Sequence, residues 1–104
     1  MGKYVLAYRG GAMGETPAEQ EAAMTQWMEW FGMLGEAMVD PGNPFGPSAT
    51  LQGDGGRGSS GQSGLGGYSI ISADTLDQAC DMAKGCPVLT GGGSVEVYEA
   101  APIG

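Results

Sequence analysis

Tyr68-Ser69-Ile70-Ile71-Ser72-Ala73-Asp74-Thr75-Leu76-Asp77-Gln78-Ala79-Cys80 is the stretch that decides the fold. Its first five residues, 68–72, are rich in aromatic and β-branched side chains, which predicts a strand. Asp74 is expected to cap a helix that runs from about Thr75 to Lys84, with Gly85 placed to end it. The helix has an apolar face, formed by Leu76, Ala79, Cys80 and Ala83. The stretch therefore predicts a strand followed by an amphipathic helix.

The N-terminal half repeats the same order of strand and helix. Residues 3–8 alternate so that Tyr4, Leu6 and Tyr8 share one face, and both faces are apolar enough to predict a central strand. Thr16-Pro17-Ala18-Glu19 predicts a helix start with a capping box, because Thr16 can cap, Pro17 suits the first turn and Glu19 can return the hydrogen bond. An apolar stripe extends this helix from Pro17 to about Met38, and its width suggests contact with a second subunit.

The remaining segments complete a six-element order. Residues 49–51 predict a short, weak strand, and residues 94–98 predict the last strand after a triple-glycine turn. Between them, the glycine-rich segment at about 53–67 is expected to be a flexible loop. The order βαββαβ predicts an α+β fold, the ferredoxin-like plait, with both helices on one face of a four-stranded antiparallel sheet. The uncovered face would need a second copy of the chain, so we expect a homodimer.

Composition limits the classes of partner. The 104 residues fit a single domain spanning 1–104. Twelve acidic residues against four basic ones give a net charge of −8, which disfavours binding to nucleic acid or to an anionic membrane. Histidine is absent, so the commonest general base and metal ligand are missing, and we expect neither a metal nor a cofactor. Cys80 and Cys86 form no CxxC pair; a single disulfide is possible, but reduced thiols in a cytoplasmic protein are the simpler interpretation.

The chain resembles the YCII-related family, which includes the DGPF proteins. The resemblance is carried by residues 65–71, 73–79, 83–87 and 91–97, and also by the first strand and the Asp40-Pro41-Gly42 turn. It covers nearly the whole chain except the glycine-rich loop. It implies a dimeric α+β barrel, in which two ferredoxin-like sheets pack face to face.

The same resemblance implies relatives that include lactone-isomerase-like proteins and dehydrochlorinases that use a His–Asp pair. This chain departs from that pattern, because Met24 falls near the position of the family's helix histidine. The DGPF tetrapeptide is also missing, and Gly53-Asp54-Gly55-Gly56 is its nearest remnant. Catalysis by histidine therefore does not carry over to this chain.

A pocket is expected between the first helix, the sheet and the loop that follows the helix. Asp40 is a candidate acid/base, because burial beside apolar walls would raise the pKa of a carboxyl group. The candidate ligand-binding residues are Arg9, Tyr8, Tyr68 and Met24, and Arg9 could clamp a carboxylate. The alternative is structural: Asp40 is a common turn residue before proline, and Arg9 could pair with an acidic neighbour.

Three functions follow from these features. The first is a homodimer that binds a small organic molecule in a partly apolar pocket. The second is a lactone isomerase or lyase that uses Asp40, which a pocket containing Asp40 and Arg9 would favour. The third is an interaction module without a ligand, which a pocket filled by Met and Trp side chains would favour.

Overall fold

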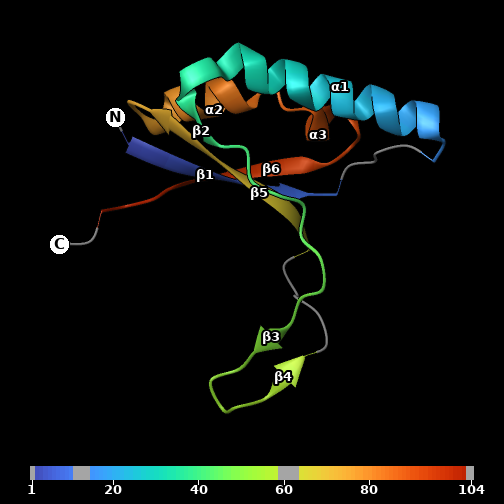
Figure 1. The fold of residues 1–104 in the computed structure, drawn as a ribbon. Helices are drawn as coiled ribbons and strands as arrows, with labels where there is room; N and C mark the ends of the chain where they lie inside the picture. The colour runs from blue at the N-terminus through green and yellow to red at the C-terminus, as the bar shows by residue number, and fades with distance from the viewer. Residues whose placement is uncertain (1, 11–14, 59–63, 103–104) are drawn as a thin grey trace.

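The computed structural model describes residues 2–10, 15–58 and 64–102, and it is an α+β fold with a four-stranded antiparallel sheet (Figure 1). The strands lie in the order β2-β5-β1-β6 and comprise β1 (Gly2–Arg9), β2 (Met38–Asp40), β5 (Leu65–Ala73) and β6 (Ser94–Glu99). One face of the sheet carries the helices α1 (Pro17–Leu34), α2 (Leu76–Ala83) and α3 (Pro87–Thr90). The central position predicted for the first strand is confirmed.

The two-residue alternation of the central strands separates a buried face from an open one. Tyr4, Leu6 and Tyr8 of β1 are at most 7% exposed and belong to the core beneath the helices. In β5 the core-facing residues include Ser69 and Ile71, both fully buried. The buried face therefore lies toward the helices, as a one-sided antiparallel sheet requires.

Helix α1 begins as its sequence predicts. The backbone N–H of Glu19 donates to Thr16 Oγ1 at 3.1 Å, and the backbone N–H of Thr16 donates to the Glu19 carboxylate at 3.5 Å. These two hydrogen bonds complete the capping box, with Pro17 in the first turn.

The predicted end of this helix, at about Met38, is wrong. The helix ends at Leu34 because Gly35 takes a φ of 55°, a left-handed value that suits glycine, while its N–H donates to the Phe31 carbonyl. A single 3₁₀ turn, η1 (Gly35–Ala37), follows, and Met38 then enters the sheet. The apolar stripe continues past Gly35, but its last residue, Met38, packs against the core from a strand.

The predicted identity of the second strand of the sheet is also wrong. Residues 38–40 form the edge strand β2, in which Met38 pairs with Ile71. The segment expected in that place forms β3 (Thr50–Leu51), which pairs only with β4 (Arg57–Gly58) in a separate two-stranded ribbon that projects away from the body (Figure 1). Part of the expected flexible loop, residues 59–63, lies outside the described residues, and residues 65–67 belong to β5 rather than to a loop.

The cap of α2 differs from the expectation by one residue. Thr75, not Asp74, is the N-cap, and its Oγ1 accepts a hydrogen bond from the Gln78 N–H at 3.0 Å. Thr75 lies three residues before that N–H, which is the spacing the cap geometry needs. Beyond Gly85, Pro87 begins the short helix α3 rather than simply following a helix end.

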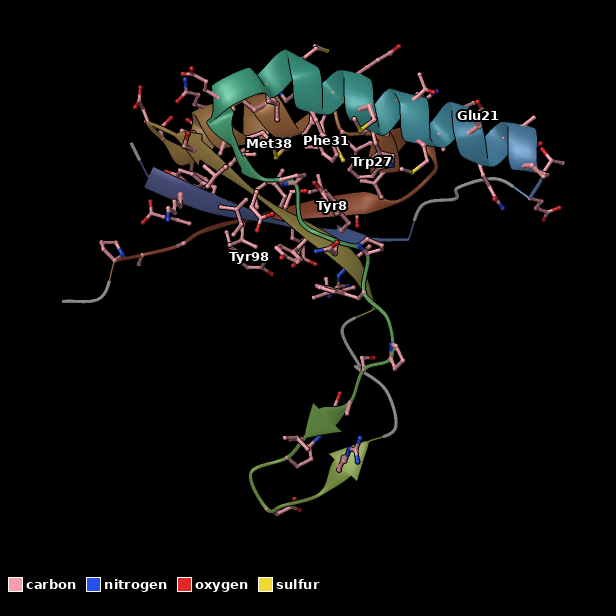
Figure 2. The ribbon with its side chains drawn as sticks, viewed as in Figure 1. Tyr8, Glu21, Trp27, Phe31, Met38 and Tyr98 are labelled. Atoms are coloured by element: carbon pink, nitrogen blue, oxygen red, sulfur yellow. The ribbon has the colours of Figure 1, made fainter. Side chains whose placement is uncertain are left out.

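The opposite face of the sheet has no covering element among the described residues. Val5, Ile70 and Tyr98 lie on this face, and Tyr98 is 55% exposed. Figure 2 shows Trp27 and Phe31 pointing from α1 toward the sheet, with Tyr98 on the far side of the sheet from the helices. The fold is thus two layers, with one apolar sheet face open. Within the described ranges, no helix is both long and apolar enough to cross a bilayer.

Candidate functional site

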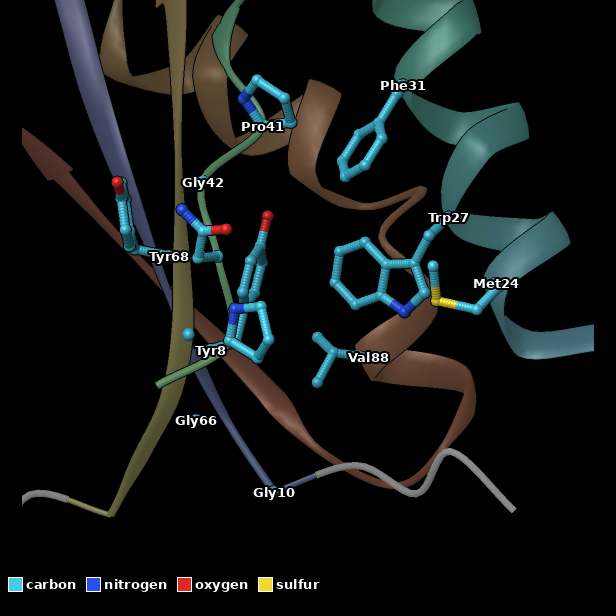
Figure 3. Close-up of a pocket in the computed structure, with 13 residues that line it drawn as sticks. Tyr8, Gly10, Met24, Trp27, Phe31, Pro41, Gly42, Gly66, Tyr68 and Val88 are labelled. Carbon is cyan, nitrogen blue, oxygen red and sulfur yellow. The ribbon is translucent and has the colours of Figure 1, made fainter. Parts of the chain in front are cut away.

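A pocket of about 490 Å³ lies between α1 and the sheet (Figure 3). Its walls come from α1, α3, the end of β1, the start of β5 and the segment that follows β2. The side chains and backbone that line it belong to Tyr8, Gly10, Met24, Trp27, Phe31, Pro41, Gly42, Asn43, Pro44, Gly66, Gly67, Tyr68 and Val88. This size is within the usual range for small-molecule sites.

One wall of the pocket is aromatic. Trp27 and Phe31 are four residues apart on α1, so they lie one turn apart on the same helix face, and their ring centroids are 5.8 Å apart. The Tyr8 ring meets Trp27 edge-on, with centroids 5.0 Å apart and ring planes at 74°. Behind them Trp30 is 3% exposed and donates its indole N–H to the Met82 carbonyl at 3.1 Å. The aromatic wall is therefore held by the core.

The other wall is the segment 41–45, which is fixed to the start of β5. The N–H of Phe45 donates to the Gly66 carbonyl at 2.9 Å, and the N–H of Tyr68 donates to the Asn43 carbonyl at 3.4 Å. Gly42 has a φ of 73°, and a Cβ there would lie 1.8 Å from the Tyr68 carbonyl oxygen. Only glycine permits this approach, so Gly42 sets the position of the wall.

The polar part of the pocket is a chain of hydrogen bonds beneath its aromatic wall. The Tyr8 hydroxyl donates to Ser69 Oγ at 2.7 Å, and the Ser69 hydroxyl donates to the Pro41 carbonyl at 2.6 Å. Burial raises the pKa of Tyr8 well above its usual value, although the hydrogen bond with Ser69 acts in the opposite direction. Burial also raises the pKa of the nearby Cys86 thiol to about 11. Both groups are therefore neutral at pH 7.

Two of the predicted ligand-binding residues line the pocket with their side chains. Tyr8 forms part of its inner wall, and Met24 lies near Trp27 on α1, 52% exposed. Tyr68 lines it at the backbone, while Figure 3 shows its ring pointing away from Trp27. That ring stacks on Phe45, with centroids 5.8 Å apart. Tyr68 pairs with Ala7 across the sheet, so it lies on the face opposite to Tyr8.

The two predicted charged residues are not among those that line the pocket. Arg9 Nε lies 2.6 Å from a carboxylate oxygen of Glu96, in a partly exposed ion pair. Asp40 Oδ1 accepts a hydrogen bond from the Gly42 N–H at 2.8 Å, as an Asx turn does. Both residues have the structural role that the sequence offered as the alternative, and a catalytic role for Asp40 stays a prediction.

The sequence did not single out several residues that build the site. Trp27 and Phe31 belong to the helical stripe, for which an apolar ligand site was an alternative to the preferred interpretation as core or dimer interface. Ser69 carried a signal too, because a serine on the buried face of a strand needs a hydrogen-bond partner. Val88 carried no such signal in the sequence, since residues 87–90 were not expected to form a helix.

The cysteines and the acidic residues are the remaining candidates for redox or metal chemistry. Cys80 and Cys86 are free thiols. No group of three or more Cys, Asp and Glu residues within the described ranges is arranged to hold a metal ion. The polar chemistry of the pocket therefore rests on hydroxyl, amide and backbone groups.

No protein-family model matches the chain. A search of the curated proteins likewise finds no match.

Proposed function

We propose that this chain binds a small organic molecule in the pocket beneath α1 and acts as a homodimer of the YCII-related kind. The pocket is the observation that carries the first part of the proposal. It is lined by Trp27, Phe31 and Met24, yet it is hollow, with a volume of about 490 Å³. A hollow apolar site with few polar groups is typical of small-molecule binding, whereas a filled one would favour an interaction module.

The test uses toluene as an apolar probe, with binding followed by the fluorescence of the tryptophans. Met24→Ala removes a side chain that lines the pocket, and the matched control Met28→Ala removes an exposed methionine four residues along the same helix. We expect Met24→Ala to weaken toluene binding about fivefold, since a partly buried methionine side chain contributes on the order of 1 kcal/mol. Met28→Ala should leave the affinity unchanged. Absence of binding to the wild-type chain, or equal effects of both variants, would count against the pocket as the site.

The dimer is supported by the arrangement of the sheet. The strand order β2-β5-β1-β6 is compatible with a ferredoxin-like plait, and the helices occupy one face alone. The other face presents Val5, Ile70 and Tyr98. Packing of two such faces would bury these apolar side chains, which supports the dimeric barrel that the family resemblance implies.

Light scattering at micromolar concentration tests the dimer. We expect the wild-type chain to have twice the mass of one protomer, and Ile70→Lys to have the mass of a single protomer, because a buried, unpaired lysine opposes association. Met33→Lys is the matched control, since Met33 is 81% exposed on α1. A monomeric wild-type chain contradicts the dimer and leaves the pocket proposal standing.

A further inference from the structure

The hydrogen-bond chain beneath the aromatic wall fixes the direction of every proton in it. The Pro41 carbonyl has no proton, so the Ser69 hydroxyl, 2.6 Å away, must donate to it. Ser69 has then used its one proton. The Tyr8 hydroxyl, 2.7 Å from Ser69 Oγ, must therefore donate its own proton to Ser69. Tyr8 Oη is left with lone pairs and no proton to offer, so it can serve the pocket only as an acceptor.

The other polar groups near the pocket do not change the direction of these hydrogen bonds. Burial raises the pKa of the neighbouring Cys86 thiol to about 11, so it stays an S–H group at pH 7. A thiol is a weak donor and a weak acceptor, and it does not compete with Ser69 Oγ for the Tyr8 proton. Asn43 is exposed, and its amide both donates and accepts, so it imposes no direction. None of the described residues that line the pocket carries a charge. A carboxylate would thus meet an acceptor, apolar walls and no cation, in a chain whose net charge is −8.

The aromatic wall defines the shape that suits this acceptor. Trp27 and Phe31 present ring faces and edges from α1, and the Tyr8 ring continues the same wall. Planar aromatic ligands make offset or edge contacts with such rings. A ring that carries one O–H or N–H group could contact this wall while its donor reaches Tyr8 Oη.

We propose that the pocket selects neutral aromatic ligands that bear a hydrogen-bond donor, with phenols as the simplest example, and rejects aromatic carboxylates. This inference rests on the proposed function, since it specifies the ligand of the same pocket. Tyr8 Oη is the selecting atom, and Ser69 and Pro41 are positioning groups that hold its proton away from the ligand. Replacement of Tyr8 by phenylalanine should therefore remove the preference without closing the pocket.

Three probes of similar shape test the inference: p-cresol, p-xylene and 4-methylbenzoate. Dissociation constants are measured by calorimetry at pH 7 for the wild-type chain and for Tyr8→Phe. We expect p-cresol to bind the wild-type chain at least tenfold more tightly than 4-methylbenzoate. We also expect the ratio of p-cresol affinity to p-xylene affinity to fall about fivefold in Tyr8→Phe, the loss of one neutral hydrogen bond. The ratio cancels the difference in hydrophobicity between the two probes.

The outcomes separate this inference from the proposed function. If p-xylene binds but the affinity ratio is the same in both proteins, the acceptor role of Tyr8 is overturned and the pocket stands. If 4-methylbenzoate binds the wild-type chain as tightly as p-cresol, the selection against carboxylates is overturned, and this comparison needs no variant. If none of the three probes binds, the proposed pocket function and the inference both fail.

Discussion

Replacement of Ser69 by alanine is expected to be among the most destabilising single-atom deletions in this chain. Ser69 is fully buried, and its hydroxyl joins two groups, because it accepts a hydrogen bond from the Tyr8 hydroxyl and donates one to the Pro41 carbonyl. Ser69→Ala leaves both groups without that partner. A buried polar group left unpaired costs about 1 to 3 kcal/mol. Because the pocket can admit water to the Tyr8 hydroxyl, we expect a total loss of about 2 to 3 kcal/mol.

Urea unfolding, followed by tryptophan fluorescence at one fixed protomer concentration, measures this loss. At a typical slope of about 1.3 kcal/mol per molar urea, the midpoint should fall by about 2 M with the slope unchanged. Ser72→Ala is the matched control, because Ser72 lies on the same strand but on the open, partly exposed face. It should change the free energy of unfolding by no more than about 0.5 kcal/mol.

The double variant gives a sharper test of the same chain of hydrogen bonds. Tyr8→Phe alone should cost about 1 kcal/mol, since Ser69 can still donate to Pro41. In the Ser69→Ala background the Tyr8 hydroxyl has already lost its acceptor, so its removal should cost nothing further. Strict additivity of the two changes, or a Ser69→Ala effect no larger than that of Ser72→Ala, would refute the reasoning.

Three further outcomes are expected. Gly42→Ala should destabilise the chain by more than about 4 kcal/mol or prevent folding, because its Cβ would lie 1.8 Å from the Tyr68 carbonyl oxygen at a positive φ. Gly46→Ala is the control and should be tolerated, because a Cβ there meets nothing within 4 Å. Circular dichroism measures the folding of both variants. Burial raises the pKa of Cys86 from 9.0 to about 11, so the stability that this shift contributes is intact below pH 9 and should fall by about 1.4 kcal/mol by pH 10. Burial also raises the pKa of Tyr8, so Cys86→Ala should show a decline in unfolding free energy that is smaller by this amount. Asp40→Asn should keep the hydrogen bond from the Gly42 N–H and leave the urea midpoint nearly unchanged. Asp40→Ala removes the acceptor and should lower the free energy of unfolding by about 1 kcal/mol. Equal effects of the two variants would contradict the Asx turn.

Features that depend on neighbouring residues could be predicted from the sequence. The capping box of Thr16 and Glu19 needs only a three-residue spacing, and the structure has both of its hydrogen bonds. The alternation of Tyr4, Leu6 and Tyr8 fixes which face of β1 is buried, whatever the strand pairs with. Both patterns depend on local geometry alone, so they could be predicted without knowledge of the fold.

Features that depend on distant pairing could not be predicted in the same way. Met38–Asp40 becomes a strand because β5 offers it hydrogen bonds from about thirty residues away, and three residues carry too little local preference to show this. Tyr8 and Tyr68 were both candidates for one pocket, but the register of β1 against β5 sends their rings to opposite faces.

The sequence by itself determined the capped first helix, the central strands and the acidic, histidine-free chemistry of the chain, because each depends on composition or on residues within a few positions of one another. The tertiary structure decided that residues 38–40 pair with β5, that Asp40 and Arg9 are not among the residues lining the pocket, and that Ser69 accepts the Tyr8 proton. Each of these follows from contacts between segments far apart in the chain, whose geometry is set only when the strands pair and the helices pack on the sheet.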